Sequence, residues 1–251
     1  MQPGKGTIEA ESVQRTSYLD RYLRGDYARR NPSWSTGDSH FKAQHVAALL
    51  KKNGISPSHV GEVGCGAGEI LVQLQAELAF PGCQFYGFEL QPEAEEQFAQ
   101  RRTAQISLKV ADFFAEPELP AFDVLMLMDV IEHVEDIFSF LRRLREKSTY
   151  QVFHIPLDLS AQGILRDVLV EVRNQVGHLH YFTKAMALQT LTDLGYRPMD
   201  WFYTSGSIDL PARSWQTQVA RLPRKALFRC DQDLAARLLG GFSLMVLTRA
   251  K

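Results

Sequence analysis

Short apolar runs alternate with amphipathic segments through the middle of the chain, as strands and helices do in an α/β fold. Residues 121–129 (AFDVLMLMD) are almost continuously apolar, which predicts a strand buried on both faces of a sheet. Apolar runs predict further strands at 59–64, 83–89, 105–111, 150–155, 198–204 and 242–249. Amphipathic periodicity predicts helices at 39–53, 68–79, 92–102, 134–147 and 184–195. This order predicts an open, mostly parallel sheet with helices on both faces.

Two segments lie outside this alternation. Residues 1–55 place an aromatic, turn-rich stretch before the helix predicted at 39–53, and we expect them to form an N-terminal helical cap or lid. Residues 156–183 interrupt the core domain, which we place at 56–251. Ligands of open α/β sheets bind outside the carboxyl ends of the strands. Each segment is therefore a candidate for covering a substrate pocket, and the alternative for each is a packing addition.

Composition and charge narrow the class of protein. The chain has 251 residues and a formal net charge of −1, which gives no electrostatic reason to expect a nucleic-acid partner. No apolar run reaches the roughly 20 residues that span a bilayer, and MQPGKGTIEAESVQ lacks the apolar segment of a secretory signal. Cys65, Cys83 and Cys230 are far apart, with no CxxC pair. We expect a reduced, cytoplasmic protein without a zinc finger. The sequence does not indicate whether the protein is a monomer or an oligomer.

The stretch EVGCGAGE, residues 62–69, places three glycines at alternate positions between a predicted strand and a predicted helix. A Walker A loop needs Lys and then Ser or Thr after its last glycine, but Glu69 and Ile70 stand there. A dinucleotide fingerprint favours a small residue where Glu69 stands, and its carboxylate would meet a pyrophosphate. The pattern therefore excludes a P-loop, argues against NAD and fits a ligand without phosphate. A tight turn with no ligand would also select glycine.

Polar residues follow each of four successive predicted strands. After the glycine loop, Glu89 ends the second strand, where its carboxylate can accept hydrogen bonds from two ribose hydroxyls. Asp112 and Phe113 follow the third strand and could bind an adenine amino group and cover the adenine face. The fourth strand leads into DVIEH, residues 129–133. Helix capping would explain one such carboxylate, but a set along one sheet edge predicts a ligand site.

Taken in order, these motifs resemble the class I S-adenosylmethionine-dependent methyltransferases of the small-molecule type, near the ubiquinone-biosynthesis O-methyltransferases. The matching stretches are EVGCGAG (62–68), Glu89, Ala111-Asp112-Phe113, DVIEHV (129–134), GHLHYFT (177–183) and LTDLGY (191–196). The resemblance covers roughly residues 59–204. It implies a Rossmann-like, seven-stranded sheet with an antiparallel last strand. It also implies S-adenosylmethionine as the cofactor and S-adenosylhomocysteine as the product.

The resemblance also implies which positions contact the cofactor. The matching residues are Glu62, Gly64, Cys65, Gly66, Gly68, Glu89, Leu90, Asp112, Phe113, Asp129, Val130 and His133. The N-terminal stretch NPSWSTGDSHFKAQ adds Trp34, together with Asp38, Ser39 and Lys42, as residues that could close over the methionine end or the acceptor. The alternative for these is a helix cap and a packed aromatic ring.

Candidate catalytic residues are histidines, because a hydroxyl acceptor needs a base near neutral pH while the sulfonium methyl is already activated. His133 is the leading candidate, with a structural histidine that contacts the cofactor as its alternative. His178 and His180 lie on a late loop predicted at the same sheet edge. Some related O-methyltransferases carry an ExxEH motif and a later histidine that hold a metal. The corresponding candidates are Asp129, Glu132, His133 and His178, but Asp129 has a shorter reach and we expect no divalent metal.

The sequence therefore predicts a methyltransferase that transfers a methyl group from S-adenosylmethionine to a hydroxyl, or an amine, of a small molecule. Two alternatives stay open at this point. One is a catalytically inactive cofactor-binding protein or partner subunit, and the other is a nicotinamide-dependent oxidoreductase on the same fold. The acceptor leaves no motif, because the segments that shape its pocket vary in sequence.

Overall fold

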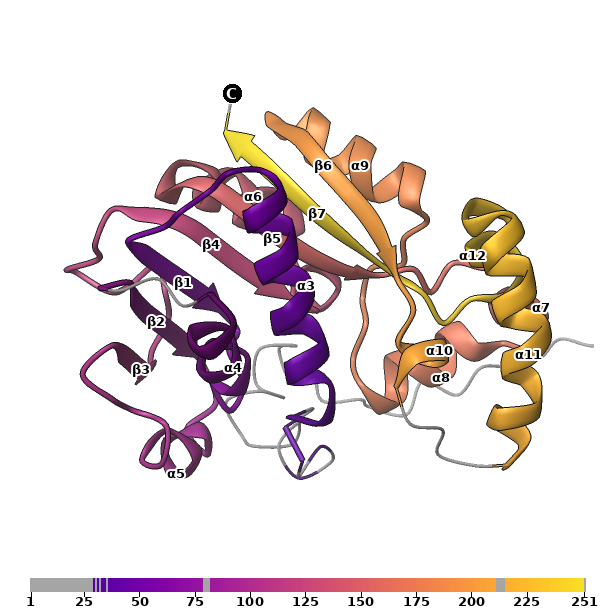
Figure 1. Cartoon of the computed structure of the whole chain (residues 1–251), viewed down its shortest axis with the longest axis horizontal. Helices are drawn as coiled ribbons and strands as arrows, with labels where there is room; N and C mark the ends of the chain where they lie inside the picture. The colour runs from indigo at the N-terminus through magenta and orange to yellow at the C-terminus, as the bar shows by residue number, and fades with distance from the viewer. Residues whose placement is uncertain are drawn as a thin grey trace, which may run out of the picture.

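The described residues form a sheet of seven strands in the order β3-β2-β1-β4-β5-β7-β6 (Figure 1). The strands are β1 His59–Val63, β2 Gln84–Glu89, β3 Ile106–Val110, β4 Phe122–Met128, β5 Ser148–Pro156, β6 Tyr196–Thr204 and β7 Ser243–Ala250. Neighbours from β3 to β5 are parallel, while β7 is antiparallel to both β5 and β6. The predicted sheet and its antiparallel last strand are confirmed.

This computed structural model describes residues 29, 31, 33, 34, 36–78, 82–210 and 215–250. Most of the N-terminal half of the predicted cap therefore lies outside the described residues. Its C-terminal half is helix α3 (Ser39–Lys52), preceded by the 3-10 turn η1 (Thr36–Asp38). Val46, Leu49 and Leu50 of α3 are buried in the same core cluster as β1 and β4. This helix thus packs as part of the layer that covers the sheet.

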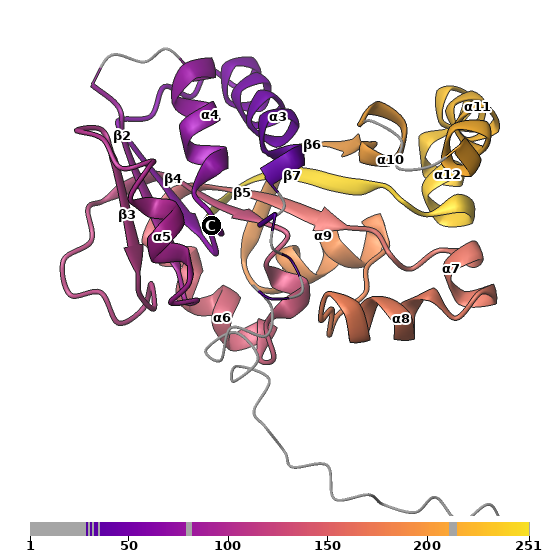
Figure 2. The same ribbon diagram turned by 90° about the horizontal axis from the view of Figure 1, so that it is seen from below.

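Helices lie on both faces of the sheet (Figure 2). One face carries α3, α4 (Glu69–Leu78) and the short α5 (Ala94–Phe98). The other carries α6 (Ile137–Leu144), continued by η3 (Arg145–Lys147), and α9 (Lys184–Asp193). The helix predicted at 92–102 is shorter than expected, because the chain turns after Phe98, whose carbonyl accepts from the amides of both Arg101 and Arg102.

The remaining helices gather around the β6 and β7 end of the sheet, away from β3 (Figure 1). Helices α7 (Ala161–Leu165) and α8 (Val168–Gln175) occupy the predicted insert. Helices α10 (Gly206–Asp209), α11 (Trp215–Cys230) and α12 (Gln232–Leu239) fill a region to which the sequence analysis assigned no element. No helix in the described part of the chain is long and apolar enough to cross a membrane.

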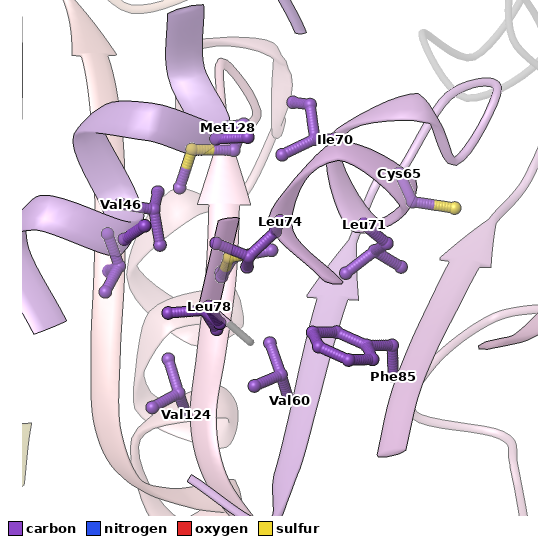
Figure 3. Close-up of a cluster of buried hydrophobic side chains, with 14 of the residues drawn as sticks. Val46, Val60, Cys65, Ile70, Leu71, Leu74, Leu78, Phe85, Val124 and Met128 are labelled. Atoms are coloured by element: carbon purple, nitrogen blue, oxygen red, sulfur yellow. The ribbon is translucent and has the colours of Figure 1, made fainter. Parts of the chain in front are cut away.

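Helix α4 fixes the position of the glycine loop, because one face of it is buried against the sheet (Figure 3). Leu71, Leu74 and Leu78 recur at helical spacing and are almost fully buried, in one cluster with Val60 of β1 and Phe85 of β2. Burial of each such side chain contributes about 1.5–3 kcal/mol. The start of α4 is thereby held against the carboxyl end of β1. There the strand order reverses between β2 and β4, which is where open α/β sheets bind ligands.

Candidate active site

One large cavity, of about 1020 Å³, opens at the carboxyl ends of the central strands. Its walls come from the glycine loop, from the residues that follow β2, β3 and β4, and from the first turns of α6. The predicted insert contributes Asp158, Val172, Val176 and His178 at one end of it. The volume is in the range of small-molecule and cofactor sites. The insert therefore lines this cavity.

The glycine loop needs glycine for two separate reasons. Gly64 and Gly68 have φ angles of 73° and 78°, in the left-handed region that other residues rarely adopt. A Cβ atom on Gly64 would lie 2.8 Å from a methyl of Val130, and one on Gly68 would lie 2.8 Å from a methyl of Leu108. The loop can therefore pass close to the strand ends only without side chains at these two positions. Cys65, between them, is buried and fills space against Gly87.

Glu89 is held rigidly at the end of β2. Its Oε2 accepts a hydrogen bond from the amide of Gly66 at 3.0 Å, and its Oε1 accepts from the amides of Leu90 at 2.9 Å and Gln91 at 3.1 Å. Burial raises the pKa of Glu89, although these amides oppose the shift. A carboxylate fixed in this way can accept hydroxyl groups of a ribose on its remaining lone pairs. Gln91, which the sequence analysis missed, also lines the cavity, and its Oε1 has no donor within the described part of the chain.

Asp112 and Phe113 differ in their surroundings. Asp112 is exposed at the cavity rim, and its Oδ1 accepts a hydrogen bond from the amide of Phe114 at 2.9 Å. Phe113 is 2% exposed and packs edge-to-face against Phe88, with ring centroids 5.2 Å apart. Phe113 is therefore mainly a core residue that touches the cavity, while the neighbouring Phe114 is more open. Its ring lies 4.0 Å from the guanidinium of Arg143, which also lines the cavity.

Asp129 forms ion pairs on both sides of its carboxylate. Its Oδ2 lies 2.7 Å from Nζ of Lys42, and its Oδ1 accepts from Nδ1 of His154 at 2.5 Å. Burial by itself would raise the pKa of Asp129, but His154 and Lys42 hold it well below its usual range. Nε2 of His154 in turn lies 2.8 Å from the hydroxyl of Thr204. Asp129 has a φ of 56°, so this clamp also holds a backbone conformation that is unusual for aspartate.

Lys42 connects the N-terminal helix to the site. Its ammonium is also 2.9 Å from Oδ2 of Asp38, and the side chain is almost fully buried. Trp34 lies beside the glycine loop, since a Cβ on Gly66 would be 3.9 Å from a carbon of the Trp34 ring. Trp34, Asp38, Ser39 and Lys42 all line the cavity. The described part of the predicted cap thus reaches the site through these side chains.

Two further acceptors at this end of the cavity have no hydrogen-bond donor among the residues that the structure describes. They are Oε2 of Glu62, which is 1% exposed, and Oδ1 of Asp38. Burial raises the pKa of Glu62 to about 8. Buried acceptors without donors are costly in a folded protein, so they suit a ligand that brings its own N–H groups. The ammonium group of an amino acid has this chemistry.

His178 and His133 lie together at the opposite end. Nδ1 of His178 is 2.6 Å from Oδ2 of Asp158, while Nδ1 of His133 is 3.2 Å from the carbonyl of Gly177. The two rings meet edge-to-face with centroids 4.8 Å apart. Burial and the neighbouring His178 lower the pKa of His133 to about 4. A carboxylate on Nδ1 places the ring proton there and leaves Nε2 of His178 as the basic nitrogen.

His180 does not join this group, contrary to the sequence-based expectation. Its Nε2 lies 2.8 Å from the carbonyl oxygen of Val134, and the residue is not part of the cavity wall. The amides of Leu179 and His180 both donate to the carbonyl of Glu132. For this reason the side chains of His178 and His180, although two residues apart, do not both reach the cavity. The structure thus argues against His180 as a catalytic residue.

Three of the four candidate metal ligands come together. One ligand atom each from Glu132, His133 and His178 lies within 4.8 Å of the others. Glu132 is fully buried, and neither of its carboxylate oxygens has a hydrogen-bond partner in the described residues. Two imidazoles and a carboxylate with free lone pairs fit a divalent cation in type. Asp129 lies outside this group because Lys42 and His154 occupy its carboxylate.

Two comparisons show similarity to known methyltransferases. Residues 62–148 match the family model described as "Methyltransferase domain". A chain of the complex between the Haloferax volcanii Trm112 methyltransferase activator and its methyltransferase has a TM-score of 0.62 at 16% identity, covering 93% of this chain and 97% of that one. Residues 62–148 thus resemble a methyltransferase domain, and the chain shares the fold of this solved structure.

Two further solved structures share the fold. Magnesium protoporphyrin IX methyltransferase from Synechocystis PCC 6803, with bound S-adenosylhomocysteine, has a TM-score of 0.54 at 14% identity, covering 84% of this chain and 83% of that chain. The N-methyltransferase NodS from Bradyrhizobium japonicum, also with S-adenosylhomocysteine, has a TM-score of 0.54 at 15% identity, covering 92% and 96%. No curated protein matched the chain by sequence. At these identities the structural likeness shows the fold alone.

Proposed function

We propose that the chain transfers the methyl group of S-adenosylmethionine to a hydroxyl, or an amine, of a small molecule. The observation that carries this proposal is the single cavity that joins two chemically different ends. At one end lie the glycine loop, Glu89 and Asp112. At the other end lie His133 and the hydrogen-bonded pair of His178 and Asp158. Such a cavity suits a cofactor and an acceptor bound side by side.

The residues at the first end fit the cofactor part by part. Glu89 would accept the ribose hydroxyls, and Asp112 would receive the adenine amino group. The unpaired Oε2 of Glu62 would receive the ammonium of the methionine part, while Lys42 has a third N–H for its carboxylate. When bound, the cofactor supplies an electrophilic methyl group on a sulfonium. The chain's task is then alignment, which can be worth roughly 7–11 kcal/mol.

The acceptor end supplies a base. Asp158 holds the proton of His178 on Nδ1, so Nε2 is available to remove a proton from a hydroxyl acceptor as the methyl group is transferred. His133 is less suited to this role, because burial keeps it neutral and weakly basic. Val172 and Val176 give this end an apolar wall. A divalent cation on Glu132, His133 and His178 would instead lower the pKa of the acceptor hydroxyl.

Two measurements test the proposal, first calorimetric titration with the ligands and then an assay of methyl transfer. The protein should bind S-adenosylmethionine and S-adenosylhomocysteine but not NAD, and heat with NAD alone would favour the oxidoreductase. Wild type and the Glu89→Ala variant would then be screened for methyl transfer from labelled cofactor to small molecules of a cell extract. Labelled product from the wild type only would support catalysis. Equal labelling from both proteins would contradict it.

The alternative function is cofactor binding without methyl transfer, in an inactive protein or a partner subunit. The Haloferax volcanii neighbour was solved in a complex with a methyltransferase activator, which is a reason to test whether this chain also needs a partner protein. Binding of both adenosyl ligands together with no turnover, even in whole extract that contains possible partners, would favour this alternative. The pairing of His178 with Asp158 favours catalysis, because a protein that only bound the cofactor would not need an oriented base at the far end.

A further inference from the structure

A chain of four side chains in contact connects the cavity to strand β6 in the sheet. Lys42 and Asp129 line the cavity, and Nζ of Lys42 lies 2.7 Å from Oδ2 of Asp129. Nδ1 of His154 on β5 lies 2.5 Å from the other oxygen of Asp129, and Nε2 of His154 lies 2.8 Å from the hydroxyl of Thr204 on β6. Neither His154 nor Thr204 is part of the cavity wall. The chain of contacts therefore begins at the cavity and ends inside the sheet.

The contacts of His154 hold its ring from both sides. The residue is buried, and its ring spans β7, which lies between β5 and β6 in the sheet. Because a carboxylate only accepts hydrogen bonds, Nδ1 of His154 carries a proton and donates to Asp129. The hydroxyl of Thr204 binds the other ring nitrogen. One oxygen of Asp129 is therefore kept on His154, and the second oxygen is left for Lys42.

A hydroxyl, an imidazole and a carboxylate in this order also occur in nucleophilic triads. Such a triad needs a hydroxyl that a substrate can reach. Thr204 is 2% exposed and does not line the cavity, so its hydroxyl is closed to a substrate. The chain of contacts therefore supports a group at the cavity and does not itself attack a substrate.

Asp38 and Asp129 together set the direction of the Lys42 ammonium. Its Nζ lies 2.9 Å from Oδ2 of Asp38 as well as 2.7 Å from Oδ2 of Asp129. An ammonium has three N–H groups, so two carboxylates direct two of them and thereby fix the third. If His154 released its oxygen of Asp129, that carboxylate would be free to turn and to offer both oxygens to Lys42. The third N–H would then lose its fixed direction.

We propose that His154 and Thr204 are positioning residues for the cofactor, and that they act through Asp129 to hold Lys42 in the orientation that binds the carboxylate of the methionine part. The proposal rests on the proposed function, in which the third N–H of Lys42 binds that carboxylate. A group that is fixed before the ligand arrives binds it more tightly, because less freedom is lost on binding. His154 and Thr204 should therefore raise the affinity for ligands that carry the amino-acid part, and they should not affect the binding of adenosine alone.

The test compares two ligands that differ in the amino-acid part, with affinities measured by calorimetry. S-adenosylhomocysteine carries the carboxylate, whereas 5′-methylthioadenosine lacks the amino-acid part but keeps the adenosine and a thioether. Thr204→Val removes the hydroxyl and keeps the shape of the side chain. It should weaken binding of S-adenosylhomocysteine about two- to tenfold, the range of one hydrogen bond, and leave the affinity for 5′-methylthioadenosine unchanged. His154→Leu removes both contacts of the ring and should weaken S-adenosylhomocysteine further, again without changing the affinity for 5′-methylthioadenosine.

Two further variants separate positioning from damage to the fold. Thr204→Ser restores a hydroxyl and should restore the affinity for S-adenosylhomocysteine. Thr248→Val is the matched control, because Thr248 is also buried, on β7, and its hydroxyl donates to Oε1 of Gln151 at 3.0 Å. This control should leave the affinities for both ligands unchanged.

The outcomes that would overturn the proposal are distinct from those that would overturn the proposed function. Wild-type affinity for S-adenosylhomocysteine in Thr204→Val, or equal weakening of both ligands in that variant, would contradict the positioning role. A selective loss in Thr248→Val of the same size would contradict it as well. If His154→Leu does not fold, Thr204→Val and Thr204→Ser decide the question. Binding of neither ligand by the wild type would instead contradict the proposed function.

Discussion

The carboxylate of Asp158 lies 2.6 Å from Nδ1 of His178, on a segment that leaves the core after β5 and returns before α9. The two residues are far apart in sequence, and the hydrogen bond closes the insert onto the acceptor end of the cavity. A second contact, from the hydroxyl of Tyr181 to the carbonyl of Leu169 at 2.8 Å, fixes helix α8 to the same loop. Two hydrogen bonds thus hold the insert together internally, and it carries both Asp158 and the proposed base His178.

Loss of this pair should slow the methyl-transfer step without weakening cofactor binding. We expect His178→Ala to lower kcat by about 10²–10⁴, as is typical for a general base, and Asp158→Asn to lower it less. The affinity for S-adenosylhomocysteine should change little in His178→Ala. His180→Ala separates the two late histidines, because the His180 ring contacts the backbone carbonyl of Val134 and does not line the cavity, and this variant should retain most of the activity. A larger loss in His180→Ala than in His178→Ala would reverse the assignment. Steady-state kinetics and calorimetry provide the readouts.

Glu89 should account for a large share of the cofactor affinity. Glu89→Gln removes the charge and places an NH₂ group against backbone amides that now donate to the carboxylate. Since hydrogen bonds to charged groups contribute about 1.5–3 kcal/mol, the Kd for S-adenosylhomocysteine should rise roughly 10- to 150-fold. Glu95→Gln, at an exposed ion pair with Arg102, is the matched control and should leave the Kd unchanged. A Glu89→Gln variant with wild-type affinity would show that the ribose binds elsewhere.

Lys42 should be important for stability because it is buried between carboxylates. Lys42→Met leaves Asp38 without its partner and Asp129 with His154 alone. Breaking a buried pair typically costs about 3–5 kcal/mol in the free energy of unfolding. Lys52→Met removes an exposed lysine that pairs with Asp200 at 2.7 Å and should cost about 1 kcal/mol or less. Urea unfolding of both variants checks the difference, and equal losses would contradict the buried network.

The pKa of Glu62 predicts a pH-dependent stability. The carboxyl has a pKa of about 8 in the folded chain and 4.5 as its ordinary value, so the folded state keeps a proton that the unfolded state releases between these values. The free energy of unfolding therefore falls as pH rises through this window, by an amount on the order of a few kcal/mol. In Glu62→Gln this contribution should be absent, and its stability should fall less between pH 5.5 and 8.5 than that of the wild type. Parallel curves in urea titrations would refute this account.

Removal of divalent metals should leave methyl transfer intact. The three-residue group of Glu132, His133 and His178 fits a cation in type, but the fourth candidate, Asp129, is held by Lys42 and His154. We therefore expect EDTA to change kcat by less than about twofold and the purified protein to hold no stoichiometric metal by elemental analysis. Loss of activity in EDTA that added Mg²⁺ or Zn²⁺ restores would assign the metal role to this group instead.

The features that the sequence predicted are those that depend on local order. The glycine loop, Glu89, Asp112 and the DVIEH run each lie at or just after the end of a strand, and parallel strands bring their carboxyl ends to one edge. Strand positions were predictable for the same reason, since β4 is apolar except for Asp123 and its pattern can be recognised without distant information. The early end of α5 and the different environments of His178 and His180 depend on turns. The hydrogen bonds of these turns leave no pattern in the sequence.

Long-range pairings were not predictable. His154 lies between the buried Phe153 and Ile155 of β5, and only the fold shows that it connects Asp129 to Thr204 across the sheet. Lys42 reaches Asp129 because α3 packs on the sheet in one particular register. Helix α11 escaped assignment because Pro223 lies inside it, where proline normally interrupts a helical pattern. The one feature of the sequence that could have pointed to His154 was the presence of a polar residue in a strand predicted to be buried.

The position of β7 has a consequence for biosynthesis. This strand is made after β6, yet it fills the gap between β5 and β6, where Met245 pairs with His154 and Ser243 pairs with Thr204. While the chain is on the ribosome, β5 therefore presents an open edge that can pair with other strands and aggregate. The spacing of His154 and Thr204 is set only once β7 is in place. Competence to bind the cofactor is thus a late event in synthesis, and chaperones that shield this edge would raise the yield of active protein.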